Sequence, residues 1–165
     1  MKNRITDDIV MPQVVILAGG LGTRLGEITE HIPKSLIEVS GKPIISHILD
    51  WVKLQGCKKV LVLTGHLGEM FEQFEYEGLS IDFHQEPEQL GTGGALSNAI
   101  DLLDEQFILL WGDDLHPIDY NKLLQTHRQG SLLTMTVTQE HEIMNLIHHD
   151  GYVTEYDKTN ENNNF

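Results

Sequence analysis

The chain has 165 residues, with 11 Lys and Arg against 25 Asp and Glu, which gives a formal net charge of −14. A hydrophobic fraction of 40% with 22% charged residues is typical of a folded globular protein and excludes a wholly disordered or membrane-embedded chain. The acidic balance repels polyphosphate backbones, so it argues against DNA or RNA as a partner.

Strand-like and helix-like segments alternate along the chain. Residues 14–17 form an all-apolar run, which is typical of a strand buried on both faces. Residues 44–55 carry apolar side chains at helical spacing, with Pro43 before them and Gly56 after them, so they predict an amphipathic helix. The other predicted elements, in chain order, are a strand at 60–63, a helix at 68–76 with Met70, Phe71 and Phe74 inward, a strand at 81–83, a helix at 93–103 with Leu96, Ala99, Ile100 and Leu103 inward, a strand at 107–111, a helix at 119–129, and strands at 132–138 and 152–156.

This alternation predicts an α/β fold with right-handed crossovers and a mainly parallel, twisted sheet. Ligands of such sheets bind outside the carboxyl ends of the strands. Three polar or glycine-rich segments fall at those ends, namely residues 19–24, 91–94 and 112–114. They are the candidate sites.

The compartment follows from cysteine usage and from the N-terminus. A single cysteine, Cys57, forms neither an intramolecular disulfide nor a zinc cluster, and is expected to be a small buried or half-buried residue. The apolar run at 14–18 is too short for a signal-peptide core or a membrane span. We therefore expect a cytoplasmic location and no membrane partner.

The glycine loop at residues 19–22 directly follows the first strand, where missing side chains let backbone N–H groups approach an anion such as a triphosphate. A tight strand-to-loop turn is the alternative. The dinucleotide fingerprint G-x-G-x-x-G requires glycine where Leu25 stands, and the P-loop requires Gly-Lys-Ser/Thr, which is absent from the chain. Neither familiar phosphate motif therefore explains the loop.

Charged residues near these segments supply candidate chemistry. Arg24 offers a planar fork and Lys34 a mobile point charge, which suits a triphosphate and a pyrophosphate leaving group; solvated surface charges are the alternative. Asp113 is placed to hold Mg²⁺ beside substrate phosphates, unless it is a turn residue that bonds its own backbone. Glu86 is a candidate acceptor for a nucleotide base, with Gly91 leaving room for the base plane, although a glycine-rich helix start looks the same.

Together these segments resemble the sugar-1-phosphate nucleotidyltransferases. The blocks that carry the resemblance are GGLGTRL at 19–25, PKSL at 33–36, GKPI at 41–44, Glu86 five residues before Gly91 in LGTGGAL, and the pair Gly112-Asp113. The LGTGGAL form is most similar to enzymes that activate mannose 1-phosphate or heptose 1-phosphate with GTP, and to N-acetylmuramate 1-phosphate uridylyltransferases.

The resemblance implies a Rossmann-like, three-layer αβα fold of the GT-A-like type and Mg²⁺-dependent attack of a sugar 1-phosphate on the α-phosphorus of GTP or UTP. It assigns Arg24 to the departing pyrophosphate, Lys34 to the α-phosphate region and Asp113 to the metal, and Lys158 is the candidate for the sugar phosphate. The implied nucleotide-binding residues are Leu17, Ala18, Gly19, Gly20, Gly22, Thr23, Glu86, Gly91 and Thr92.

By the same resemblance, residues 1–158 form a nucleotidyltransferase domain with a shortened C-terminal part, and residues 159–165 form a polar tail. Two other functions stay open at this point. One is a non-catalytic module that binds a nucleotide or a nucleotide sugar. The other is a glycosyltransferase in which Asp113 and Asp114 hold Mn²⁺, although the Arg24 and Lys34 block argues against it. His141, His148, His149 and Asp150 are read as a polar hairpin in preference to a metal site.

Overall fold

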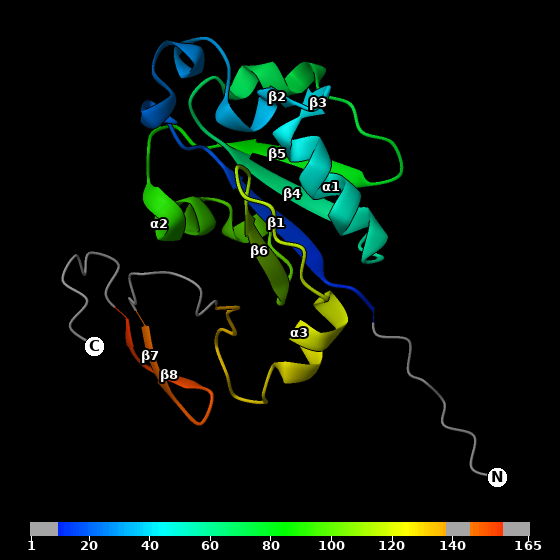
Figure 1. The fold of residues 1–165 in the computed structure, drawn as a ribbon, viewed down its shortest axis with the longest axis vertical. Helices are drawn as coiled ribbons and strands as arrows, with labels where there is room; N and C mark the ends of the chain where they lie inside the picture. The colour runs from blue at the N-terminus through cyan, green and yellow to red at the C-terminus, as the bar shows by residue number, and fades with distance from the viewer. Residues whose placement is uncertain (1–9, 138–145, 157–165) are drawn as a thin grey trace. The chain divides into compact units, whose positions relative to one another are not determined.

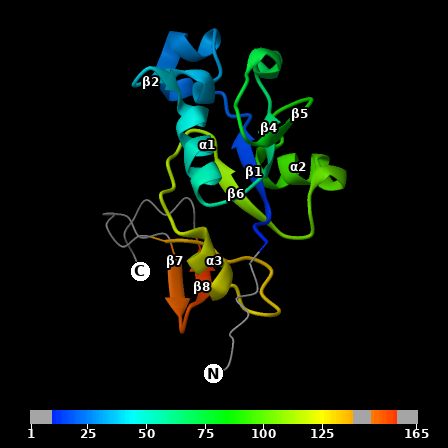
Figure 2. The same cartoon turned by 90° about the vertical axis from the view of Figure 1, so that its right-hand side faces the viewer.

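The computed structural model describes residues 10–137 and 146–156. Contacts between residues divide the chain into two compact units, Met1–Asn121 and Lys122–Phe165. Figures 1 and 2 show the elements of both units in two perpendicular views. The two units are described separately.

The first unit is built on a four-stranded parallel sheet in the order β5-β4-β1-β6. Strand β1 is hydrogen-bonded on both edges, to β4 and to β6, and β4 in turn pairs with β5. The bounds of the four strands are Gln13–Ala18 for β1, Lys59–Thr64 for β4, Ser80–Gln85 for β5 and Phe107–Trp111 for β6. The predicted parallel sheet is therefore confirmed.

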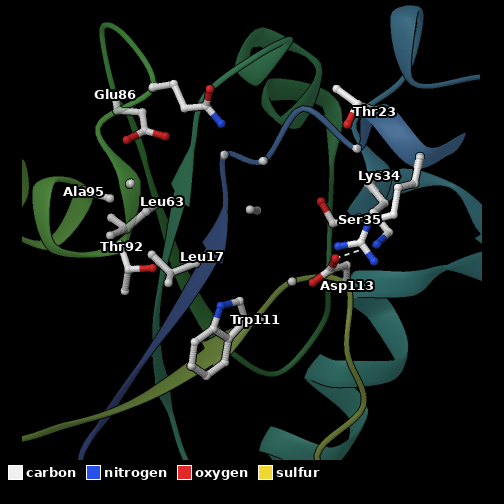
Figure 3. Close-up of a pocket in the computed structure, with 18 residues that line it drawn as sticks. Leu17, Thr23, Lys34, Ser35, Leu63, Glu86, Thr92, Ala95, Trp111 and Asp113 are labelled. Atoms are coloured by element: carbon white, nitrogen blue, oxygen red, sulfur yellow. Dashed lines mark hydrogen bonds and ion pairs between the residues drawn. The ribbon is translucent and has the colours of Figure 1, made fainter. Parts of the chain in front are cut away.

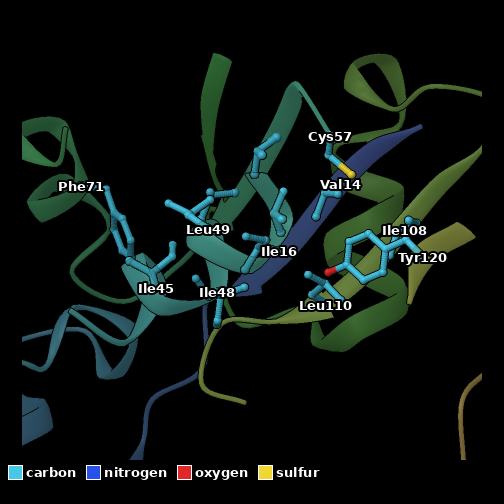
Figure 4. Packing of buried hydrophobic residues seen from close by; sticks show 14 of the residues in the cluster. Val14, Ile16, Ile45, Ile48, Leu49, Cys57, Phe71, Ile108, Leu110 and Tyr120 are labelled. Atoms are coloured by element: carbon cyan, nitrogen blue, oxygen red, sulfur yellow. The ribbon is translucent and has the colours of Figure 1, made fainter. Parts of the chain in front are cut away.

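Helices cover both faces of this sheet. Successive side chains of a strand point to opposite faces, so Val14 and Ile16 pack into one apolar cluster with α1 (Ile44–Leu54), as Figure 4 shows. Val15 packs into a second cluster with α2 (Gly91–Asn98). Figure 2 shows the sheet between these two helices. The three-layer αβα arrangement is thus confirmed.

Shorter elements complete the first unit. A two-residue strand β2 (Glu38–Val39) pairs antiparallel with β3 (Lys42–Pro43), and α3 (Tyr120–Thr126) begins where this unit ends. The 3-10 helices are Thr23–Glu30, Lys34–Leu36, Gly68–Gln73 and Ile100–Leu102. Cys57 is fully buried, and burial raises the pKa of its thiol to about 11.

Two predicted helices differ from the structure. The segment predicted at 68–76 is a 3-10 helix over Gly68–Gln73, and Met70 is exposed. With three residues per turn, Phe71 and Phe74 share the inward side and Met70 leaves it. The helix predicted at 93–103 breaks after Asn98, and the 3-10 turn that follows leaves Ile100 exposed.

The second unit contains an antiparallel hairpin of β7 (Leu146–His149) and β8 (Tyr152–Tyr156). Its turn places Asp150 and Gly151 at positive φ, as a tight two-residue hairpin turn requires. The strand predicted at 152–156 is confirmed as β8. His148, His149 and Asp150, which the sequence pattern indicated as part of a polar hairpin, lie on β7 and in its turn.

Two further predictions in this part of the chain need correction. Residues 132–137 form no strand, and the apolar side chains Leu132 and Leu133 are exposed. An apolar run alone does not make a strand where no neighbouring strand pairs with it. The helix predicted at 119–129 is limited to Tyr120–Thr126. Thr138, His141, Lys158 and the tail at 159–165 lie outside the described residues. Within the described ranges, no helix is both long enough and apolar enough to cross a membrane.

The packing of α1 on the sheet gives a testable prediction. Leu49 is fully buried on α1, whereas Leu54 on the same helix is 72% exposed. We expect Leu49→Ala to lower the free energy of unfolding by about 2–5 kcal/mol, because it leaves a cavity in the core. The matched control Leu54→Ala should change it by less than about 0.5 kcal/mol. Urea unfolding followed by circular dichroism measures both, and equal losses would contradict this packing.

Candidate functional site

The strand order creates a crevice at the carboxyl end of β1. The chain passes from β1 to β4 on one side, while β6 lies on the other, so the loops that leave β1 and β6 diverge. A cavity of about 300 Å³ lies at this position, and Figure 3 shows the residues that line it. The cavity therefore stands where ligands of parallel α/β sheets bind.

The glycine loop after β1 forms one wall of the cavity. Gly22 has φ 64°, and a Cβ atom there would lie 2.7 Å from Thr29 Cγ2. Thr29 is buried and its hydroxyl donates to the carbonyl oxygens of Gly22 and Gly26, each at 3.1 Å. Thr29 thus holds the loop in shape, a role that the sequence pattern did not reveal.

Lys34 and Asp113 meet at one end of the cavity. Lys34 Nζ donates to Asp113 Oδ2 at 2.6 Å, although the two residues are 79 positions apart. Lys34 begins the 3-10 helix after Pro33, and Asp113 follows Gly112, whose N–H donates to the Leu17 carbonyl at 2.8 Å. Both side chains are about one-third exposed, 34% and 39%. The pair is therefore partly accessible to solvent.

Glu86 lies at another wall, directly after β5. Its N–H donates to the Thr64 carbonyl at 2.9 Å, which extends the β4–β5 pairing by one residue. Its Oε2 atom is buried and has no hydrogen-bond partner among the residues that the structure describes. A Cβ atom on Gly19 or on Gly65 would collide with its Oε1 atom. Two glycines at the ends of β1 and β4 therefore make room for this carboxylate.

The structure brings together nearly all of the site residues that the sequence singled out. Those that line this cavity are Leu17, Ala18, Gly19, Gly20, Gly22, Thr23, Arg24, Lys34, Glu86, Gly91, Thr92, Gly112 and Asp113. Lys158 is outside the described residues, and so is His141. His148 and His149 lie exposed on β7, in the second unit.

Five lining residues were not anticipated from the sequence: Ser35, Leu63, Gln89, Ala95 and Trp111. The most distinctive is Trp111, the last residue of β6, which is 48% exposed. An aromatic residue that ends a parallel strand directly before Gly-Asp was the available signal, because ligands bind at that edge.

The donor set fits Mg²⁺ that is held largely by a bound nucleotide. Within 10–137 and 146–156, no group of three or more His, Cys, Asp or Glu side chains could form a metal cage. Asp113 is a single carboxylate at the edge of the cavity beside a cation. Mg²⁺ commonly uses one or two carboxylates and takes its other ligands from phosphates and water. Asp113 is therefore suited to be a single protein ligand of Mg²⁺. The described residues do not offer a complete cage of protein ligands.

Comparison with known families decides the identity of this fold. The model of the family described as nucleotidyl transferase matches residues 13–154. The chain belongs to this family. The matched segment includes the whole sheet and every described residue of the cavity.

Curated members of the nucleotidyl transferase family are similar to this chain over most of its length. It is 37% identical over 120 residues to the UTP–glucose-1-phosphate uridylyltransferase AglF of Haloferax volcanii, covering 71% of this chain and 49% of that protein. It is 34% identical over 119 residues to a D-glycero-alpha-D-manno-heptose 1-phosphate guanylyltransferase of Aneurinibacillus thermoaerophilus, covering 70% and 52%. The chain thus spans about half the length of these relatives.

Solved structures show the same architecture. HddC from Yersinia pseudotuberculosis, complexed with GMP-PN, matches with a TM-score of 0.63 and 34% identity over 70% of this chain and 54% of that one. A UDP-glucose pyrophosphorylase complexed with UDP-glucose matches with a TM-score of 0.62 at 22% identity, which bears on the fold alone. The nucleotidyltransferase fold expected from the sequence is confirmed.

The glycine loop gives a second prediction. Gly22→Ala places a side chain at positive φ and against Thr29, so we expect it to lower the free energy of unfolding by more than about 1 kcal/mol. Gly20→Ala is the matched control, because a Cβ there meets nothing within 4 Å. Thermal unfolding of the two variants measures the difference. Equal stability would show that the loop does not adopt this conformation.

Proposed function

We propose that this protein transfers a nucleoside monophosphate from GTP or UTP to a sugar 1-phosphate, which yields a nucleoside-diphosphate sugar and pyrophosphate. The observation that carries the proposal is the convergence of Arg24, Lys34 and Asp113 beside the glycine loop in one cavity. The similarity to uridylyltransferases and guanylyltransferases supports it.

The phosphates of the nucleotide would lie between the glycine loop and the Lys34–Asp113 pair. Backbone N–H groups of a glycine-rich turn form an anion-binding concavity. Arg24 is exposed where it lines the cavity, so its guanidinium is free to fork onto the β- and γ-phosphates. Arg24, Lys34 and the backbone N–H groups of the loop would concentrate positive potential at this site, in a protein whose net charge is −14.

In the proposed reaction, an oxygen of the sugar phosphate forms a bond to the α-phosphorus, and the bond from that phosphorus to the bridging oxygen of the β-phosphate breaks. The electron pair leaves with pyrophosphate. Lys34 would turn from Asp113 to the α-phosphate and Arg24 would hold the departing group, so positioning and charge stabilisation supply the catalysis. Bound Mg²⁺, held by Asp113, would neutralise charge on the phosphate oxygens.

The competing functions predict other substrates or no turnover. A glycosyltransferase acts on a nucleotide sugar, which has no β,γ-pyrophosphate to release and so leaves Arg24 without the role proposed here. A binding module retains nucleotide binding without pyrophosphate release. The role of Lys158 at the sugar phosphate, the domain bounds of 1–158, the cytoplasmic location and the absence of a nucleic-acid partner stay predictions from the sequence.

Pyrophosphate release in the presence of nucleotide, Mg²⁺ and a panel of sugar 1-phosphates tests the proposal. We expect turnover only with all three components. Asp113→Asn and Arg24→Ala should each lower kcat at least about 100-fold, because each removes charge stabilisation from the transition state. Asp101→Asn is the control, since Asp101 is exposed and lies outside the cavity lining. Nucleotide binding by the folded protein without turnover on any sugar phosphate would contradict a catalytic role.

A further inference from the structure

Strand β5 is an edge of the sheet that lacks the usual protection against further pairing. Among the described residues its one strand partner is β4, with which Ser80–Gln85 pair in continuous register. Figure 2 shows β5 as the outermost strand, beyond β4. Edge strands are commonly protected by proline, lysine, a bulge or very short length. β5 has six residues, contains neither proline nor lysine, and pairs without a register shift. The described part of the chain therefore leaves its outer edge open to another strand.

The pairing with β4 shows which backbone groups of β5 face outward. Ser80 and Glu86 donate their N–H groups, both at 2.9 Å, to carbonyl oxygens at either end of the β4 segment. Alternate residues of a strand direct their backbone groups to the same side. The even-numbered residues of β5 therefore face β4, and the N–H and C=O groups of Ile81, Phe83 and Gln85 face away from it. These groups form a row of donors and acceptors along the outer edge.

The side chains near this edge differ between the two faces of the sheet. Phe83 is 37% exposed on the α1 face, where its ring centroid lies 5.6 Å from that of Phe71. Asp82 and His84 lie on the α2 face, because each is paired with a leucine of the apolar cluster under α2. Asp82 is exposed, and His84 Nε2 forms a hydrogen bond with Asn98 Oδ1 at 2.7 Å, which leaves its Nδ1 atom for a second partner.

The edge is complementary to a second copy of itself. In an antiparallel pair centred on Phe83, this residue lies opposite Phe83 of the second copy in a hydrogen-bonded pair, and Ile81 lies opposite Gln85. All the outward backbone groups of the strand then have partners. Asp82 lies opposite His84 of the second copy, on both sides of the twofold axis. These are non-hydrogen-bonded pairs, in which side chains approach most closely.

Neighbouring registers are less favourable. An antiparallel pair centred on Asp82 sets this carboxylate opposite Asp82 of the second copy. A pair centred on His84 sets Asp82 opposite Glu86. Like charges directly opposite each other destabilise a strand pair. The charges along β5 therefore favour the register centred on Phe83.

We propose that β5 pairs with β5 of a second copy of this chain, antiparallel about a twofold axis at Phe83, and so joins two sheets into one continuous sheet. A second copy is the partner that the edge fits, because Asp82 and His84 complement each other only across that axis. The same surface is used on both copies, so the contact closes into a dimer and not a fibre. The proposal concerns assembly, and it is independent of the proposed activity.

Sedimentation velocity of the wild-type chain tests the proposal directly. The measurement is made over a wide concentration range in physiological salt, which screens the long-range repulsion between two acidic copies. We expect the 18.7 kDa chain to give way to a species of twice that mass as concentration rises. A chain that stays monomeric up to millimolar concentration would overturn the proposal.

Charge variants assign the contact to this edge. Asp82→Lys sets a lysine opposite His84 of the second copy, so the dimer dissociation constant should rise at least about tenfold. Asp101→Lys is the matched control, since it makes the same charge change on an exposed residue of the 3-10 helix Ile100–Leu102. Both changes lower the net negative charge, which by itself favours association. Equal effects of the two variants would overturn the proposal. Adding His84→Glu to Asp82→Lys restores opposite charges and should recover most of the lost affinity.

Cysteine cross-linking tests the register. In the double variant Asp82→Cys, His84→Cys, the two positions lie opposite each other in different copies with a Cα separation of about 4.5 Å, which suits a disulfide. Mild oxidation should therefore yield a covalent dimer. Asp82→Cys alone places its thiols on a longer diagonal and should yield much less, and the native Cys57 is fully buried. Equal yields from the single and double variants, or no covalent dimer from the double variant, would overturn this register.

Discussion

The central position of β1 is the constraint on which this structure depends. β1 is hydrogen-bonded on both edges and buried on both faces, with Val14, Val15 and Ile16 fully buried. Its end is therefore the fixed point around which the neighbouring loops are arranged. The hydrogen bond from Gly112 N–H to the Leu17 carbonyl extends the pairing of β1 with β6 by one residue beyond the end of β6. This pairing places Asp113, the next residue, beside the glycine loop.

The two ends of the cavity differ in how their charges are satisfied. Lys34 and Asp113 neutralise each other in a partly exposed ion pair, which contributes little to stability and is easily exchanged for new partners. Glu86 is half-buried, and its Oε2 atom has no hydrogen-bond partner among the residues that the structure describes. In the proposed function, the phosphates of a bound nucleotide would lie at the ion pair and its base would lie toward Glu86.

Local patterns in the sequence predicted the sheet and most of the site, because a buried parallel strand is a continuous apolar run and its ligands lie at the loop that follows. They could not show the ion pair of Lys34 with Asp113, which is a tertiary contact over 79 positions. The exposed side chains of Met70 and Ile100 were missed because 3-10 turns replace the α-helical spacing there. Thr29 acts through its place in the fold, and no spacing marks it, whereas the position of Trp111 directly before Gly112-Asp113 was a signal that the sequence offered.

Tryptophan fluorescence tests the central claim, that the nucleotide binds in this cavity, most directly. The chain has two tryptophans: Trp111 lines the cavity, whereas Trp51 lies on α1 and donates to the Ile118 carbonyl at 3.0 Å. In a Trp51→Phe variant, Trp111 is therefore the one remaining reporter. Titration with GTP and Mg²⁺ should change its emission saturably. An unchanged emission under conditions where equilibrium dialysis shows bound nucleotide would place the nucleotide elsewhere and contradict this account.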